Sequence, residues 1–310
     1  MDERAAGARG GALKIRPGLA ALALVWACSG TQAEALRYCD PPTPLTAAQS
    51  DQRLRLAALI KGALQASGQR VALIARSGLD LQRFGVRYSH AGVTLLASAN
   101  AAWSVRQLYY ACDERRPKVF DQGLPGFVLG LHDPAVGYVS VVLLPEASAA
   151  ALEQAALDNA TALALLGGQY SANAYPFSTR YQNCNQWVLE LLATAWGGLR
   201  GDALRERAQA WAQAQGYAPT VFDVGSRVLM WAGALIPWLH RDDHPEPDLD
   251  ALRYRVSMPA SLEAFVQATV PGAQRLEFCQ AGTRVVVHRG WEPVAEGCVA
   301  QGDDEVVPLD

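Results

Sequence analysis

The stretch VRYSHAGVTLLASANAAWSVRQLYYAC, residues 86–112, contains two runs of β-forming residues separated by a short segment of small side chains. The runs cover 86–97 and 102–112, and the small residues SANA between them predict a hairpin. Further β-type runs cover 70–76 and 137–145. Because hairpin strands run antiparallel, we predict a central antiparallel sheet.

Helical patterns surround these strands, with apolar residues recurring at spacings of three and four. They cover 45–67, 146–168, a segment from Cys184 to the glycines at 197–198, 202–216 and 260–269. Strands and helices together predict an α+β fold, with the helix carrying Cys184 packed against the sheet. We expect a core over residues 36–200 and a C-terminal helical and β extension over 201–310.

Residues 1–35 have the pattern of a secretory signal peptide. Basic residues precede the short apolar run GLAALALVWA (18–27), and small residues at 33–35 suit signal-peptide cleavage. Cys28 suggests a lipoprotein site as an alternative, although Trp26 fits such a site poorly. We therefore expect a periplasmic or secreted protein, cleaved near residues 33–35.

The composition excludes some classes of partner. The chain has 310 residues and a formal net charge of −3, so nothing in its charge favours nucleic acid. The hydrophobic fraction of 50% provides enough apolar surface for a sizeable core.

Five cysteines follow the predicted leader, so at least one of them has no intramolecular partner. Cys279 and Cys298 flank a β-type run, which favours a local disulfide between them. Cys39 and Cys112 form the second expected pair. This assignment leaves Cys184 as the free thiol, although other pairings are compatible with the sequence.

Cys184 lies between two asparagines at the start of a predicted helix, in the sequence NCNQWV (183–188). The backbone N–H groups of a helix N-terminus stabilise a thiolate, so we expect a lowered thiol pKa there. The same N–H groups can hold an oxyanion. The structural alternative is that Asn183 caps the helix and Cys184 is a small buried hydrophobic residue.

His90 is the best candidate for the base that a nucleophilic cysteine needs. Strand alternation places it on one face with Gly92, which leaves room for another element beside the imidazole. If the hairpin turn centres on Ser98–Asn100, His90 faces Gln107 or Tyr109. Gln107 is preferred, because its carbonyl can accept the ring N–H and orient the ring. The structural alternative is a half-buried histidine that is hydrogen-bonded without a chemical role.

The ordered motifs HAG (90–92), Gln107 in WSVRQL and NCNQWV (183–188) resemble the circularly permuted papain-like superfamily. That group includes the NlpC-type cell-wall peptidases and the lecithin:retinol acyltransferase-like proteins. The blocks RYCDPP, YSHAG, DQGLPGFVLG and GGQYSANAYPFSTRYQNCNQWV also resemble the bacterial family named domain of unknown function 2145. The first resemblance implies catalytic roles for Cys184 as nucleophile, His90 as base and Gln107 as orienting residue.

We expect an exported thiol hydrolase, an amidase or peptidase that acts on cell-wall peptides, with no metal or organic cofactor. One alternative is a thiol acyltransferase or lipid-acyl hydrolase. Another is a catalytically inactive envelope binding or assembly module on the same scaffold. The apolar segment 224–239 is then a contact with a membrane surface or a protein.

Overall fold

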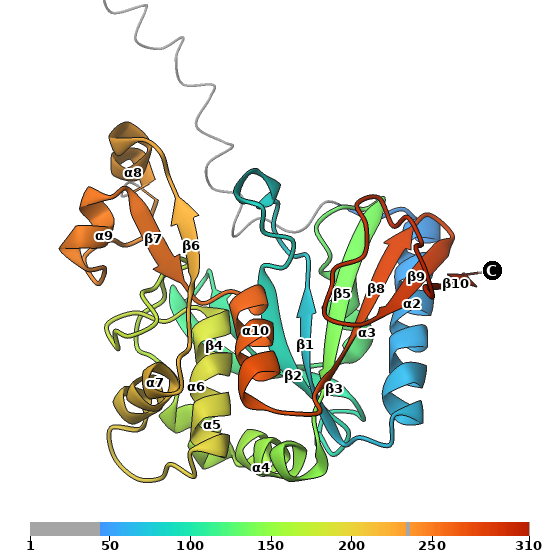
Figure 1. The fold of residues 1–310 in the computed structure, drawn as a ribbon, viewed down its shortest axis with the longest axis horizontal. Coiled ribbons are helices and arrows are strands. Elements are labelled where there is room, and N and C mark those ends of the chain that lie inside the picture. The colour runs from blue at the N-terminus through green and yellow to red at the C-terminus, as the bar shows by residue number, and fades with distance from the viewer. Residues whose placement is uncertain (1–43, 234–235, 310) are drawn as a thin grey trace, which may run out of the picture. The chain divides into compact units, whose positions relative to one another are not determined.

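The computed structural model describes residues 44–233 and 236–309, and its strands form two sheets (Figure 1). The larger is an eight-stranded antiparallel sheet in the order β10-β9-β8-β5-β1-β2-β3-β4, and the smaller pairs β6 with β7. The strands are β1 (Val71–Arg76), β2 (His90–Leu95), β3 (Ser104–Ala111), β4 (Arg116–Gln122), β5 (Val136–Leu143), β6 (Thr220–Asp223), β7 (Arg253–Val256), β8 (Gln274–Ala281), β9 (Arg284–Arg289) and β10 (Glu305–Pro308).

Helices connect and cover these strands. They are α2 (Ala47–Ala66), α3 (Leu124–Leu129), α4 (Glu146–Leu157), α5 (Asn159–Ala164), α6 (Cys184–Trp196), α7 (Leu204–Ala214), α8 (Arg227–Gly233), α9 (Glu246–Asp250) and α10 (Pro259–Thr269), with a short 3₁₀ helix, η1 (Gln82–Phe84). The expected α+β fold with an antiparallel sheet is therefore confirmed.

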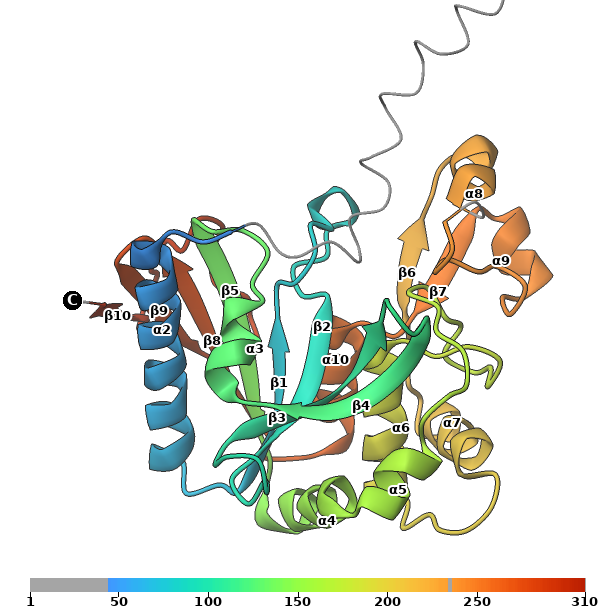
Figure 2. The same ribbon diagram turned by 180° about the vertical axis from the view of Figure 1, so that it is seen from behind.

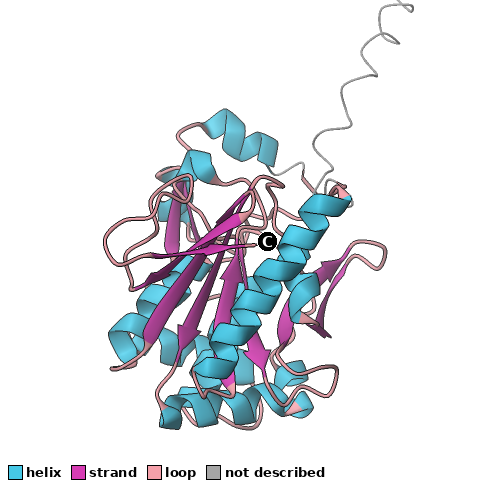
Figure 3. Ribbon diagram, turned by 90° about the vertical axis from the view of Figure 1, so that its right-hand side faces the viewer, coloured by secondary structure: helices cyan, strands magenta, loops and turns pink. Residues whose placement is uncertain are grey.

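Helices cover both faces of the large sheet. The helices α2 and α3 lie on one face, whereas α6 and α10 lie on the other (Figures 1 and 2). In the view from the side of α2, this long helix crosses in front of the strands (Figure 3). The sheet is therefore the middle layer of three, and side chains alternate between its two covered faces.

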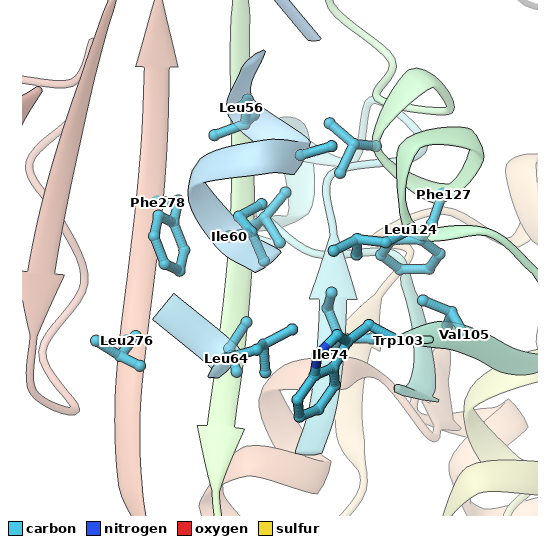
Figure 4. Close-up of a cluster of buried hydrophobic side chains, with 14 of the residues drawn as sticks. Leu56, Ile60, Leu64, Ile74, Trp103, Val105, Leu124, Phe127, Leu276 and Phe278 are labelled. Atoms are coloured by element: carbon cyan, nitrogen blue, oxygen red, sulfur yellow. The ribbon is translucent and has the colours of Figure 1, made fainter. Parts of the chain in front are cut away.

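The core beneath α2 joins parts of the chain that are far apart in sequence. Leu56, Ile60 and Leu64 of α2 are buried against Ile74 of β1 and Phe278 of β8 (Figure 4). Fully burying one such side chain stabilises the fold by about 1.5–3 kcal/mol. Because β8 belongs to the C-terminal part, residues 201–310 contribute three strands to the same sheet as the N-terminal part.

The predicted hairpin is present as β2 and β3. Their antiparallel register pairs Val93 with Arg106, Thr94 with Val105 and Leu95 with Ser104. The pairing ends at Val93, whereas β3 continues to pair with β4 as far as Ala111. The two strands of the hairpin therefore separate at the end where His90 lies.

Two features differ from the sequence prediction between residues 112 and 168. The predicted helix 146–168 is two helices, because Asp158 breaks it and its carboxylate accepts the backbone N–H groups of Ala160 and Thr161. The strand β4 and the helix α3 were not predicted. Proline is unfavourable inside a central strand, so Pro117 gave no reason to predict one here. Because β4 is an edge strand, its proline is tolerated.

The predicted disulfide between Cys279 and Cys298 is present, and Cys184 is a free thiol. A disulfide is typical of proteins in oxidising compartments. The predicted leader 1–35, Cys28 and the Cys39–Cys112 pairing involve residues outside the described part of the chain. Among the described residues, no helix has the length and apolar character needed to cross a membrane.

Candidate active site

Cys184 is the first residue of α6, as the sequence predicts. Asn183 is the N-cap, and its side-chain oxygen accepts the backbone N–H of Gln186 at 2.7 Å. Cys184 is 7% exposed, and the residues that follow it in α6 are buried as far as Thr194. The thiol therefore lies at a capped, buried helix N-terminus.

His90 begins β2, and its Nε2 is hydrogen-bonded to Oε1 of Gln107 on β3. The amide nitrogen of Gln107 donates to Oε1 of Gln122 at 2.7 Å. This second bond fixes Gln107 with its oxygen toward the imidazole. With this orientation of Gln107, the ring carries its proton on Nε2 and Nδ1 is unprotonated.

The alternative partner of the imidazole, Tyr109, makes only a ring contact. Its ring centroid is 6.5 Å from that of His90, and the side chain is 49% exposed. Phe127 of α3 contacts the imidazole at a centroid distance of 6.0 Å. Gln107 is therefore the hydrogen-bonding member of the hairpin, as preferred from the sequence.

Gly92 allows β3 to approach closely at this point. A Cβ atom on Gly92 would lie 2.5 Å from Cγ1 of Val105 and 2.9 Å from the carbonyl oxygen of Arg106. Both distances are far shorter than van der Waals contact. The expected role of Gly92, close approach beside the imidazole, thus has a direct steric basis.

The structure places Cys184 beside the backbone of His90 rather than in a hydrogen bond with its ring. Among the described residues, Gln107 is the side-chain hydrogen-bond partner of the imidazole. The Cys184 thiol lies close enough to the backbone N–H of Ala91 for that group to affect its pKa. The side chain of Asn185 also accepts the Ala91 N–H at 2.9 Å. Helix α6 thus meets β2 at the residue that follows His90.

Burial controls the protonation states of both candidates. Burial raises the pKa of Cys184 to about 12, against the lowering effects of Arg76 and of the N–H groups of Asn185, Cys184 and Ala91. Burial also lowers the pKa of His90 to about 3; Arg76 lowers it further, and the bond to Gln107 opposes this shift. The expected lowered thiol pKa is therefore wrong: the resting pair is a neutral thiol and a neutral imidazole.

Arg76 is a member of the site that sequence reasoning missed. It ends β1 directly opposite His90 in the strand register, and its guanidinium carbon lies 5.2 Å from the centroid of the Phe127 ring. Gly130 makes room for the guanidinium, because a Cβ atom there would lie 2.6 Å from it. The only sequence signal for Arg76 is a charged residue at the end of a buried strand.

Tyr181 and Gln182, in the loop that precedes α6, are further candidates to donate to an oxyanion, but their side chains are engaged elsewhere. The hydroxyl of Tyr181 donates to Asp242 at 3.3 Å, and its ring stacks on His240 with centroids 4.2 Å apart. Gln182 donates its backbone N–H to Gln169 and bonds through its side chain to Gly167, Leu165 and Glu190. The N–H groups of Cys184 and Asn185, at the helix start, remain as candidate donors.

The histidines of the segment HRDDH (240–244) hold the loop that leads to Cys184. His240 stacks on Tyr181, and the Nε2 of His244 is hydrogen-bonded to the carbonyl oxygen of Asn173 at 2.7 Å. Within residues 44–233 and 236–309, no group of three or more His, Cys, Asp or Glu side chains is arranged to bind a metal ion.

Part of the C-terminal region covers the start of α6. The side-chain nitrogen of Asn183 donates to the carbonyl oxygen of Ser257 at 3.4 Å, and that of Asn185 lies 3.8 Å from the sulfur of Met258. A surface hollow of about 630 Å³ lies elsewhere, lined by residues such as Pro145 and Arg289. The segment around Met258 therefore lies beside the first turn of α6.

No curated protein and no solved structure matches this chain. One family model does, described as "Uncharacterized protein conserved in bacteria (DUF2145)", and it matches residues 63–266. The matched segment contains the cysteine helix, the hairpin of His90 and Gln107, and the covering segment around Met258. Because the match spans well over half of the 310 residues, the chain belongs to the DUF2145 family.

Proposed function

We propose that this protein is an exported thiol hydrolase that cleaves an amide bond. The observation that carries the proposal is the joint placement of three groups. A free thiol begins a capped helix, this helix meets the strand of His90, and Gln107 orients His90 with Nδ1 unprotonated. A free nucleophile, a base and a group that orients the base are the parts that such chemistry requires.

The protonation states favour a concerted first step. Because the resting pair is neutral, Nδ1 of His90 accepts the thiol proton as Sγ of Cys184 attacks the carbonyl carbon. The N–H groups of Cys184 and Asn185 hold the developing oxyanion. The imidazolium then protonates the leaving amine, and a thioester forms on Cys184. Water completes hydrolysis, whereas an alcohol or amine acceptor would give acyl transfer.

The order of the elements supports a circularly permuted papain-like arrangement as the finer description of the fold. The base strand precedes the nucleophile helix in the chain, and the helix packs on the hairpin that carries the base. Cell-wall peptides are the first substrate class we propose, because the expected leader sends the chain to the periplasm. Acyl esters, as for a lipid-acyl hydrolase or acyltransferase, are the second.

The rate of Cys184 alkylation by iodoacetamide as a function of pH tests this function. With neutral His90 as the proton acceptor, we expect a rate that is flat across the neutral range. In His90→Ala, the rate should follow the thiolate fraction and rise about tenfold per pH unit. His132→Ala is the matched control, since this histidine is exposed. The same profile in wild type and His90→Ala would contradict the proposal.

If the profiles differ, a screen of cell-wall peptides and acyl esters identifies the substrate class. Cleavage of peptides alone indicates a peptidase or amidase, and release of acyl chains alone indicates the second class. Cys184→Ser should lose turnover of either substrate.

A non-catalytic envelope binding or assembly module is the second candidate, and α8 favours it. Val228, Leu229 and Trp231 are 77%, 57% and 67% exposed, an unusual apolar surface for one short helix. Complementation of a strain lacking the protein separates the two functions. A binding module would tolerate Cys184→Ser and fail with Val228→Ser combined with Trp231→Ser, whereas a hydrolase gives the reverse result.

A further inference from the structure

Among the described residues, no strand pairs beside His90 with the edge of β2 that faces β3. The β2–β3 register ends at Val93, and β3 continues along β4 instead. The backbone N–H of Ala91 and the carbonyl of Ser89 lie on this stretch, where a β-ladder would normally satisfy such groups. These two groups belong to the residues on either side of His90.

Asn185 satisfies both groups with one side chain. Its Oδ1 accepts the N–H of Ala91 at 2.9 Å, and its Nδ2 donates to the carbonyl of Ser89 at 3.1 Å. A carboxamide has one acceptor oxygen and a donor nitrogen, as a peptide group of a partner strand has. Asn185 therefore replaces β3 as the partner of β2 at this point, and it is 2% exposed.

The same residue follows the nucleophile in the chain. Because Asn185 lies in the first turn of α6, its two bonds join the helix start directly to the backbone on both sides of His90. A shift of α6 along the sheet would break both bonds in a buried environment, which is costly. The relative placement of thiol and imidazole thus depends on this carboxamide.

We infer that Asn185 is the positioning residue that holds His90 in register with Cys184. This inference rests on the proposed function, since it concerns the same pair of groups. The Asn185 side chain acts through the backbone on both sides of His90 and does not need to touch the substrate. An asparagine is required because aspartate lacks the donor for Ser89, and glutamine is longer by one methylene.

Comparison of Asn185→Ala with Gln186→Ala tests the inference. Gln186 is an equally buried amide on the same turn, but its nitrogen bonds to the carbonyls of Pro176 and Ser178 and to Glu190. We expect both variants to lose stability. Only in Asn185→Ala should the alkylation rate fall in the pH range where it is flat and depends on His90. We expect a fall of about tenfold to a hundredfold, because a misplacement of about 1 Å can cost that much.

A double variant shows whether Asn185 acts through His90. Asn185→Ala combined with His90→Ala should alkylate at the same rate as His90→Ala alone. Additive losses, or an equal loss in Gln186→Ala, would overturn the inference. If His90→Ala itself matches wild type, the proposed function fails first, so the two failures are distinguishable. Thermal unfolding of each variant identifies those that do not fold.

Discussion

Two buried polar clusters lie in this fold, and they avoid the cost of burial in opposite ways. Around Arg275, the charges are kept and paired: its guanidinium donates to Glu263 at 2.7 Å and to Glu277 at 2.9 Å. Around His90 and Cys184, burial shifts both pKa values so that neither group is charged. The first arrangement fixes charges in place, whereas the second keeps both groups neutral.

Under the proposed function, the first cluster is structural and the second is chemical. Burial raises the pKa of Glu277, but Arg275 and the hydrogen bonds from Tyr88, Val294 and Arg87 outweigh it, so that carboxylate stays ionised. The imidazole of His90 has a neutral partner, Gln107, and a cationic neighbour, Arg76. A fixed ion pair resists proton transfer, whereas a neutral thiol and a neutral imidazole are the states from which the proposed first step begins.

The largest effect on stability should come from breaking the charged cluster. Arg275→Ala leaves Glu263 and Glu277 buried without their shared partner, and we expect a loss of about 3–5 kcal/mol in the free energy of unfolding. Urea denaturation with the disulfide intact measures it. Arg284→Ala, an exposed arginine on β9, is the control and should change stability little. Equal losses in the two variants would remove the distinction between the clusters.

A smaller effect should appear as the pH dependence of stability. The pKa of His90 falls from 6.5 to about 3 in the folded protein, so between these values the unfolded chain binds a proton that the folded chain does not. Stability is therefore lost as pH falls below about 6.5, by up to about 1.4 kcal/mol per pH unit. His90→Ala lacks this contribution.

Urea unfolding of wild type and His90→Ala at neutral and mildly acidic pH measures the difference. We expect the stability difference between the two proteins to change by about 2 kcal/mol between pH 6.5 and pH 5, with wild type losing more. A difference that is constant with pH would show that His90 titrates normally and that the pair is not held neutral by burial.

The smallest effect should come from Arg76→Gln. Removing this cation raises the pKa of His90 and that of the Cys184 thiol, because Arg76 lowers both. The NMR titration of the imidazole should move upward in pH, and in the His90→Ala background the thiolate-dependent alkylation profile should do the same. Arg116→Gln, an exposed arginine on the edge strand β4, should leave both unchanged. Downward movement in either measurement would contradict the electrostatic role of Arg76.

Local patterns predicted the parts of the fold that depend on neighbouring residues. The hairpin, the start of α6 at Cys184 and the Cys279–Cys298 disulfide follow from short stretches, and strand alternation led to the bond between His90 and Gln107. The catalytic roles of these residues stay predictions.

What the sequence did not reveal depends on tertiary packing. The pKa of Cys184 is set by burial, which outweighs the helix N-terminus that the sequence shows. Arg76 and Asn185 become relevant only through the register of β1 with β2 and the separation of β2 from β3. The N-cap at Asp158 was also not predicted, because it lies within an Ala-rich run that has the composition of one continuous helix.

The amide chain from Gln122 through Gln107 to His90 also gives the site a direction. Gln107 accepts from the imidazole and donates to Gln122, so both amides would have to rotate together to reverse the chain. An amide does not titrate, so no proton can leave the ring through Nε2. In the proposed function, proton exchange at the imidazole is therefore confined to Nδ1. In the proposed reaction the leaving amine carries off the thiol proton, and the attacking water must restore it through the same nitrogen.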